Sequence, residues 1–172
     1  MKRAAALLVS WSFMLLAGCT QTVHHVRMDT ARLSATLAQD RKVACAYRVG
    51  QLEDARSSRA TAGGLGIHAF DFPDVVQVLR SQLGIAGLSE TAGAAVDIRV
   101  LHLYLSQSGP TKVPVAVYQV RIDQAPARLI RSQPTTSNWL GSENEAYRAY
   151  RAAMDGAMSQ VLDYLDANCK KG

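Results

Sequence analysis

The sequence AVDIRVLHLYL, residues 95–105, decides the fold of this chain. Every second residue from Val96 to Val100 is apolar, whereas Asp97 and Arg99 fall on the other face, and this alternation predicts a β-strand. The second half, from Leu101 to Leu105, is apolar on both faces. We therefore expect a long strand that is central in its sheet or covered on both sides.

Two further strands follow this stretch. Residues 106–112 contain Ser-Gly-Pro, which is typical of a turn, and residues 113–123 alternate again. A short link at residues 124–126 then leads to a strand at residues 128–133. Connections this short join antiparallel neighbours, so we expect the three strands to form an antiparallel meander.

Three more elements complete the predicted domain. Residues 42–52 alternate as a first strand. One helix is predicted from a cap at Asp71, through an apolar stripe, to about Leu83. Another is predicted from a capping box that begins at Ser142 to about residue 170. The sequence therefore predicts an α+β domain in the order strand, helix, three strands, helix. We expect an antiparallel four-stranded sheet with both helices packed on one face.

Tyrosines recur at helical spacing in the last predicted helix, at Tyr147 and Tyr150. A row of aromatic rings is sometimes a ligand platform. At this spacing, together with Met154 and Val161, it is more typical of a helix face packed on a core. We therefore interpret both tyrosines as core residues.

The N-terminus has the pattern of an export signal. Two cations, Lys2 and Arg3, precede an apolar run that ends at Leu16, and small residues follow. The run is about 13 residues long, against the roughly 20 that a membrane-spanning helix needs. We therefore expect a cleaved signal peptide.

The residues that close this leader, Leu16-Ala17-Gly18-Cys19, resemble the bacterial lipobox. The resemblance implies cleavage after Gly18 and attachment of diacylglycerol, with fatty acyl chains such as palmitate, to Cys19. Thr20 in place of Asp implies sorting to the periplasmic face of the outer membrane of a Gram-negative cell. The alternative is an ordinary signal peptide with a chance cysteine. The expected organisation is a signal peptide at 1–18, a lipidated N-terminus and tether at 19–40, and a periplasmic domain at 41–172.

The cysteine count agrees with export. With Cys19 as the lipid carrier, two of the three cysteines remain, Cys45 and Cys169. An oxidising compartment favours their pairing as a disulfide. The alternative is a buried thiol at Cys45 and a free thiol at Cys169. In either case no further cysteine is available as a metal ligand.

Charge argues against a nucleic-acid partner. The formal net charge is +5, and it falls to +3 when Lys2 and Arg3 leave with the leader. The remaining basic residues are scattered along the chain, whereas nucleic-acid binding needs a basic patch or stripe. We expect a solvated surface of mixed charge.

Motifs for catalysis, metals and cofactors are missing from the sequence. The run Gly63-Gly64-Leu65-Gly66 lacks the Lys-Ser/Thr ending of a phosphate loop, so we expect a flexible surface loop. His24 and His25 are adjacent and point in different directions, which favours a solvated tether over a metal site. We interpret His102 as a hydrogen-bonded sheet residue. We therefore expect no metal, no cofactor and no enzymatic activity, with an envelope hydrolase of unrecognised site as the alternative.

The chain combines the lipobox, the tether, Asp54-Ala55-Arg56 after the first strand, the hairpin and the closing helix. On these features it resembles the YajG-like lipoproteins of Gram-negative bacteria. That resemblance implies an envelope lipoprotein without assigned catalysis, and Cys45 and Cys169 depart from it. We read Asp54-Ala55-Arg56 itself as a local ion pair. A second likeness is to the auxiliary lipoproteins of lipid-trafficking ABC transporters, although their tryptophan-containing helix start is missing before Val75.

These observations predict a lipid-anchored component of the cell envelope that binds or scaffolds an envelope protein or lipid. The candidate contact residues are Phe70, Trp139 and Leu140, because they are large apolar side chains in predicted loops, and aromatic residues are enriched at binding hot spots. Trp139 packed on the core is the alternative. A lipid carrier is a further possibility, and it requires an apolar cavity between the sheet and the helices.

Overall fold

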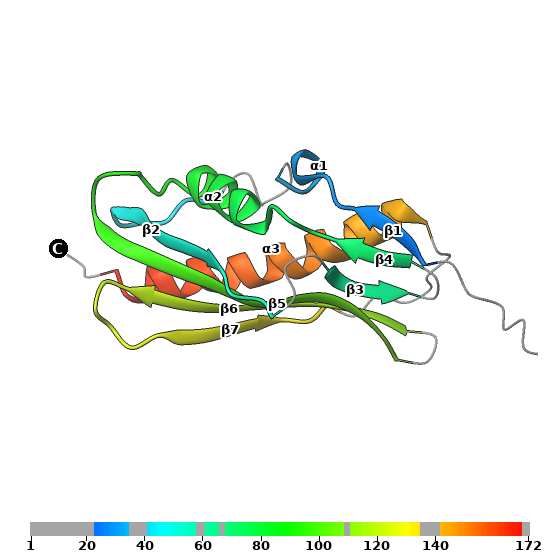
Figure 1. Ribbon diagram of the computed structural model, residues 1–172. Coiled ribbons are helices and arrows are strands. Elements are labelled where there is room, and N and C mark those ends of the chain that lie inside the picture. The colour runs from blue at the N-terminus through cyan, green and yellow to red at the C-terminus, as the bar shows by residue number, and fades with distance from the viewer. Residues whose placement is uncertain are drawn as a thin grey trace, which may run out of the picture.

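The computed structural model describes residues 23–34, 41–57, 61–65, 68–108, 111–134 and 142–169. Within these residues the elements are β1 (His24–Arg27), α1 (Thr30–Ser34), β2 (Tyr47–Asp54), β3 (Thr61–Leu65), β4 (His68–Asp71), α2 (Val75–Ile85), β5 (Ala94–Ser108), β6 (Thr111–Ile122), β7 (Arg128–Ser132) and α3 (Glu143–Ala167). Figure 1 shows these elements along an elongated molecule.

Strand β5 is the centre of the sheet, as its apolar sequence predicts. It has 15 residues and pairs with β6 in antiparallel register from Val96↔Ile122 to Ser108↔Thr111. Strand β7 pairs with β6, also antiparallel. The predicted meander of three strands is therefore confirmed.

The other edge of β5 carries two short strands, one after the other. Strand β2 pairs in parallel with the first half of β5, from Tyr47↔Ala94 to Asp54↔Val100. Strand β3 pairs in parallel near the far end of β5, at Gly63↔Leu105. Beyond β3 the sheet continues through β4 to β1. A β-bulge between Val100 and His102 shifts the alternation in the second half of β5, so Leu103 and Leu105 are buried while His102 is exposed.

The sheet is mixed and has seven strands, so the predicted antiparallel four-stranded sheet is wrong in size and direction. Parallel pairing needs a crossover between the two strands. Here β3, β4 and α2 together connect β2 to β5. Helix α2 begins at Val75 after Asp74, and the predicted cap, Asp71, is instead the last residue of β4.

Part of the predicted tether belongs to the folded domain. Strand β1 pairs with β4 in parallel, and the chain then enters α1, where Asp29 Oδ1 accepts a hydrogen bond from Ala31 N at 2.8 Å. Val26, Met28 and Leu33 are buried. Their burial stabilises this segment on the domain, because each apolar side chain removed from water contributes roughly 1.5–3 kcal/mol.

The core lies between the sheet and the helices. Helix α3 packs on β6 and β7, and α2 packs on β2. The Tyr150 ring is edge-on to Phe70 at 5.8 Å and to Phe72 at 6.2 Å between ring centroids. Tyr147 is 4% exposed and Tyr150 0%, so the prediction that these tyrosines are core residues is confirmed.

The start of α3 has the capping box that the sequence predicts. Ser142 Oγ accepts a hydrogen bond from Glu145 N, and Glu145 Oε2 accepts one from Ser142 N at 3.1 Å. These two bonds satisfy donors that a helix start otherwise leaves without partners.

Gly63 lets β3 approach β5, and its replacement should weaken this contact. Its φ is +91°, and a Cβ built there would lie 2.5 Å from Leu105 O. We expect Gly63→Ala to lower the free energy of unfolding by about 1–3 kcal/mol, because an alanine is strained at positive φ and collides with backbone. Urea denaturation monitored by circular dichroism measures this change.

Gly84 provides the matched control for Gly63. It lies inside α2, and a Cβ there meets nothing within 4 Å. Gly84→Ala should therefore raise stability by at most about 0.5–1 kcal/mol, since glycine is unfavourable in a helix and Gly84 lies in the last turn of α2. Equal effects of the two substitutions would contradict the close approach at Gly63.

Candidate functional site

The outer face of the sheet is the side of β5 and β6 that points away from α3. Strand alternation places Asp97 and Arg99 of β5 on it, and the β-bulge between Val100 and His102 brings His102 and Tyr104 onto the same side. At one end it carries a cavity of about 210 Å³. The residues that line this cavity are Gln51, Asp97, Arg99, Gln119, Arg121 and Ala127.

Asp97 organises the polar end of the outer face. Its Oδ2 accepts hydrogen bonds from Arg121 Nη2 at 2.7 Å and Arg121 Nε at 3.2 Å, and its Oδ1 accepts one from Gln51 N at 2.7 Å. Burial alone would raise the pKa of Asp97, but the bonds from Arg121 and Gln51 hold that pKa below its usual value. Asp97 is therefore ionised at neutral pH and keeps Arg121 in place.

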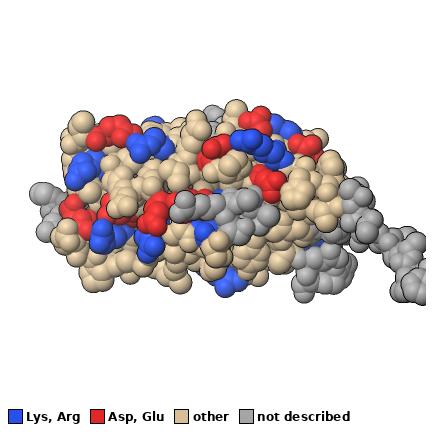
Figure 2. Space-filling view, viewed as in Figure 1, with Lys and Arg blue, Asp and Glu red and all other residues tan. Residues whose placement is uncertain are grey.

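Arg99 makes a second link across three strands. Its Nε donates to Glu53 Oε2 of β2 at 2.8 Å, and its Nη1 donates to Gln119 Oε1 of β6 at 3.1 Å. The register puts Arg99 beside both partners. Basic and acidic side chains are thus held in pairs. Figure 2 shows that basic and acidic residues are interspersed over the visible face of the molecule. Such a surface offers ordered polar groups without a strong field of one sign.

A second cavity, of about 200 Å³, lies beside the second half of β5 and is also lined by the residues after β2 and by Gly63 of β3. Its lining includes Arg56, Ser57, His102 and Tyr104. The His102 ring is edge-on to Tyr104 at 6.3 Å, and it has no hydrogen bond within the described part of the chain. The prediction that His102 is a sheet residue is confirmed, and the hydrogen bond predicted for its ring stays a prediction. Ser57 and His102 both line this cavity.

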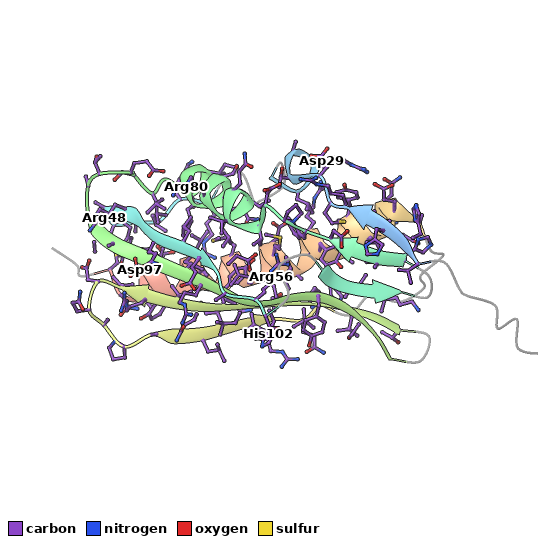
Figure 3. All side chains as sticks on the ribbon, in the orientation of Figure 1. Asp29, Arg48, Arg56, Arg80, Asp97 and His102 are labelled. Atoms are coloured by element: carbon purple, nitrogen blue, oxygen red, sulfur yellow. A yellow bond between two sulfur atoms is a disulfide. The ribbon has the colours of Figure 1, made fainter. Side chains whose placement is uncertain are left out.

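The Asp54–Arg56 ion pair is present, as predicted from Asp54-Ala55-Arg56. Arg56 Nε donates to Asp54 Oδ1, and Nη2 to Oδ2, both at 2.8 Å. Arg56 Nη2 also donates to the carbonyl oxygen of Phe72 at 2.7 Å. The pair therefore ties the end of β2 to the chain between β4 and α2, beside the second cavity. Figure 3 shows Arg56 near the middle of the molecule and Asp97 nearer the end that is far from β1.

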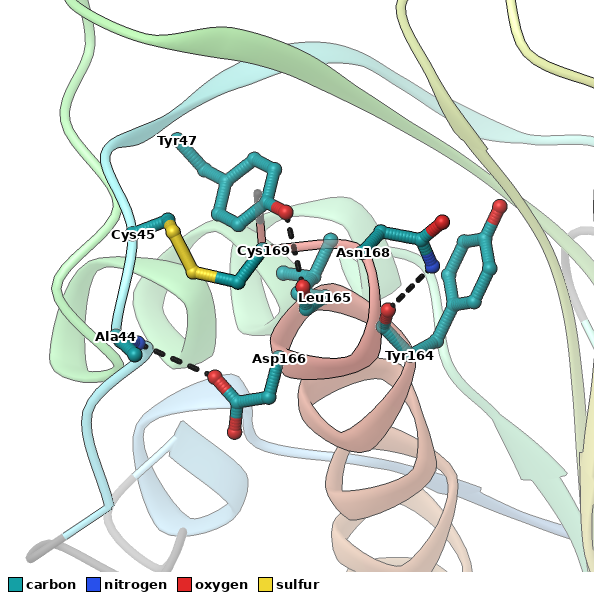
Figure 4. Close-up of a disulfide and its surroundings, with 8 residues drawn as sticks. All are labelled: Ala44, Cys45, Tyr47, Tyr164, Leu165, Asp166, Asn168 and Cys169. Carbon is teal, nitrogen blue, oxygen red and sulfur yellow. Dashed lines mark hydrogen bonds between the residues drawn. A yellow bond between two sulfur atoms is a disulfide. The ribbon is translucent and has the colours of Figure 1, made fainter. Parts of the chain in front are cut away.

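The predicted disulfide between Cys45 and Cys169 is present, with a Cα–Cα distance of 5.7 Å. It joins the segment before β2 to the residues that follow α3 (Figure 4). Two hydrogen bonds support it, from Tyr47 Oη to Leu165 O at 2.9 Å and from Ala44 N to Asp166 Oδ1 at 3.1 Å.

The predicted contact residues are placed only in part. Phe70 is 1% exposed and packs on Tyr150, so its side chain lies in the core and not on a binding surface. A phenylalanine after a glycine run resembles a loop residue, but here it belongs to the short strand β4. Cys19, Trp139 and Leu140 lie outside the described residues.

The helices and the ionisable side chains of the described ranges bear on membrane insertion and metal binding. None of the helices there is long and apolar enough to span a bilayer. No group of three or more histidine, cysteine, aspartate or glutamate side chains is placed to hold a metal ion in the same ranges.

Asp155 of α3 is a partly buried carboxylate between two helices. Its Oδ1 accepts a hydrogen bond from Gln82 Nε2 of α2 at 3.1 Å. Burial raises the pKa of Asp155 to about 6, and the charge of Arg151 offsets part of this effect. Ionisation of Asp155 is therefore less favourable in the folded than in the unfolded chain.

Asp155 should make the protein more stable in mild acid. Its pKa is higher in the folded than in the unfolded chain, so the folded state binds more protons between about pH 4 and pH 6, and stability falls as the pH rises through this window. We expect the wild type to gain stability between about pH 7 and pH 5 relative to Asp155→Asn, which cannot titrate. Urea denaturation of both proteins at both pH values separates the contribution of Asp155 from that of the other titratable groups. Identical pH profiles would contradict it.

Comparisons with known proteins find structures of low similarity. No family model matches the chain, and no curated protein matches it. A minor lipoprotein from Acinetobacter baumannii has a TM-score of 0.40 and 15% identity over 69% of this chain and 91% of its own. An uncharacterized protein has a TM-score of 0.42 and 12% identity over 86% and 98%. A Xanthomonas campestris protein of family DUF330 has a TM-score of 0.39 and 13% identity over 82% and 91%. The resemblance to YajG-like lipoproteins is not confirmed by these matches.

Proposed function

We propose that this protein is a lipid-anchored component of the cell envelope, exported to the periplasm and held at the outer membrane through Cys19. In this proposal it is not an enzyme. Its domain binds another envelope component through the outer face of the sheet, at the end organised by Asp97.

The disulfide is the observation that carries the export part of the proposal. Disulfides persist in the periplasm and other oxidising compartments and are rare in the cytosol. The Cys45–Cys169 bond uses both cysteines of the domain. This pairing leaves Cys19, at the end of the leader, as the thiol that would carry the lipid. Two or more acyl chains on that thiol would give stable anchoring.

The outer face supports the binding part. The helices pack against the other side of the sheet, and the cavity at Asp97 is lined by side chains whose positions are fixed by ion pairs. Arg121 is 47% exposed at its side chain, and Arg99 49%. Ordered and exposed arginines bind a partner at low entropic cost, because their guanidinium groups are already oriented. Residues of this kind are enriched at protein interfaces.

Lipid labelling tests the anchor. Cells that express the full chain are grown with a palmitate analogue that carries a reporter group, and Cys19→Ala is the comparison. We expect label and membrane association in the wild type and neither in Cys19→Ala. An unlabelled wild-type protein with a free mature N-terminus, or a cytosolic one, would overturn the proposal.

Site-specific photocrosslinking tests the binding face. A photoreactive residue is placed at Gln119, and at Arg80 of α2 as the matched control on a helix surface. We expect one reproducible adduct from Gln119 in intact cells, its loss in Arg121→Glu, and no such adduct from Arg80. Adducts from both positions, or from neither, would count against this face as the interface.

A further inference from the structure

His24 and His68 face one another at the edge of the sheet. The parallel register of β1 and β4 pairs His24 with His68, and their Nδ1 atoms lie 3.2 Å apart. The rings meet edge to face, with an angle of 81° and 5.3 Å between centroids. Strand alternation places both on the same face as Val26 and Phe70, where the apolar core ends. His24 and His68, which are 44 positions apart in sequence, thus bring two imidazole nitrogens close together.

From this juxtaposition we propose that His24 and His68 form a binding site for a divalent transition-metal ion, Cu²⁺ or Zn²⁺. Histidine nitrogens bind such ions at about 2.0–2.1 Å, so two of them on a tetrahedral ion are about 3.3 Å apart. The observed distance of 3.2 Å is close to this value. Imidazole suits both ions, and Cu²⁺ binds the more tightly of the two.

Metal binding requires a change of tautomer in one of the two histidine rings. In the metal-free pair one Nδ1–H donates to the Nδ1 lone pair of the other ring. An ion between the rings needs both lone pairs, so the donor ring moves its proton from Nδ1 to Nε2, and two neutral imidazoles release no net proton. Protons compete with the ion for the nitrogen lone pairs, so metal affinity falls with falling pH. With two protein ligands, water completes the coordination and the ion exchanges readily.

His25 does not belong to this site. It is the next residue of β1 and lies on the opposite face, where its Nδ1 is 3.1 Å from Asp71 Oδ2. The prediction that His24 and His25 point in different directions is therefore confirmed. The partner of His24 comes from β4, which the sequence did not identify as a strand.

Metal titration of the full chain in detergent micelles, without a polyhistidine tag, tests the proposal. CuCl₂ and ZnCl₂ are the probes, and affinity is measured by competition with a chromophoric chelator. We expect one saturable ion per chain and an affinity loss of about tenfold or more in His24→Ala and in His68→Ala. His25→Ala, with its side chain removed from the same strand, should change affinity by less than about twofold.

Spectra of the wild type test the proposal without the variants, in which loss of a histidine side chain could detach β1 from β4. The electron paramagnetic resonance of bound Cu²⁺ should show coupling to two nitrogens. Bound Zn²⁺ should shift the ring ¹⁵N signals of His24 and His68 and leave those of His25 and His102 unchanged. Equal losses in all three variants, no loss in any, or ring signals that do not respond to Zn²⁺ would each overturn the proposal.

Discussion

Replacing Cys45 and Cys169 together by serine should lower the free energy of unfolding by about 4–5 kcal/mol. The bond joins residues separated by 124 positions, so it removes the entropy of a very long loop from the unfolded chain. A domain of this size has a stability of about 5–15 kcal/mol, and the loss is therefore a large part of it. Urea denaturation at neutral pH measures the change.

Reduction of the wild type is the control for this experiment. Dithiothreitol should bring the wild-type denaturation midpoint close to that of the double variant and leave the double variant unaffected. The end of α3 should loosen first, since the disulfide fastens Cys169, just after α3, to the segment before β2. Hydrogen exchange at the last turn of α3 would report this loosening. A midpoint unchanged by reduction would contradict a stabilising role for the disulfide.

Arg56→Ala should be the most damaging single substitution of a charged residue, with a loss of about 3–5 kcal/mol. The side chains of Arg56 and Asp54 are 3% and 12% exposed, so removing the guanidinium leaves a carboxylate in a site with little water. The carbonyl of Phe72 loses its donor as well. Thermal and urea unfolding both measure the effect.

The matched control is Arg80→Ala, which breaks an ion pair with Glu90 on the surface. Those side chains are 50% and 63% exposed, and exposed pairs contribute about 0–1 kcal/mol. A double variant, Asp54→Asn with Arg56→Met, should recover part of the loss because no buried charge is left unpaired. Similar effects of Arg56→Ala and Arg80→Ala would contradict the buried pair.

The parts of the fold that the sequence predicted correctly are those with a strong local pattern. The alternation of residues 95–105, the short turns and the Ser142 capping box each determine a conformation within a few residues. The Asp54–Arg56 pair also belongs to this group, since its members are two residues apart. In these cases the interactions that stabilise the element lie inside the element.

Strands β1, β3 and β4 were missed because their stability comes from pairing and not from their own sequence. Each has four or five residues, and β3 contains two glycines, which are unfavourable in an isolated strand. Strand β3 adds to the edge of β5, β4 adds to β3, and β1 adds to β4. The first predicted strand also started too early, because Val43 and Cys45 alternate in sequence but lie before β2.

The candidate site was predictable only as separate pieces. Asp97 and Arg99 were placed correctly on the polar face of their strand. Their partners, Arg121 and Glu53, depend on the register between strands, which the alternation of a single strand does not determine. The partner of His24 was missed because it lies in β4, which the sequence did not identify as a strand.

Strand β1 begins five residues after Cys19. A fully extended chain covers at most about 3.6 Å per residue, so a lipid on Cys19 would keep β1 within about 18 Å of the bilayer surface. The start of α3 lies at the same end, because Asp29 N donates to Tyr147 Oη. Helix α3 spans about 37 Å from there toward the disulfide at the other end (Figure 1). A partner of this domain would therefore contact it within a few nanometres of the bilayer surface.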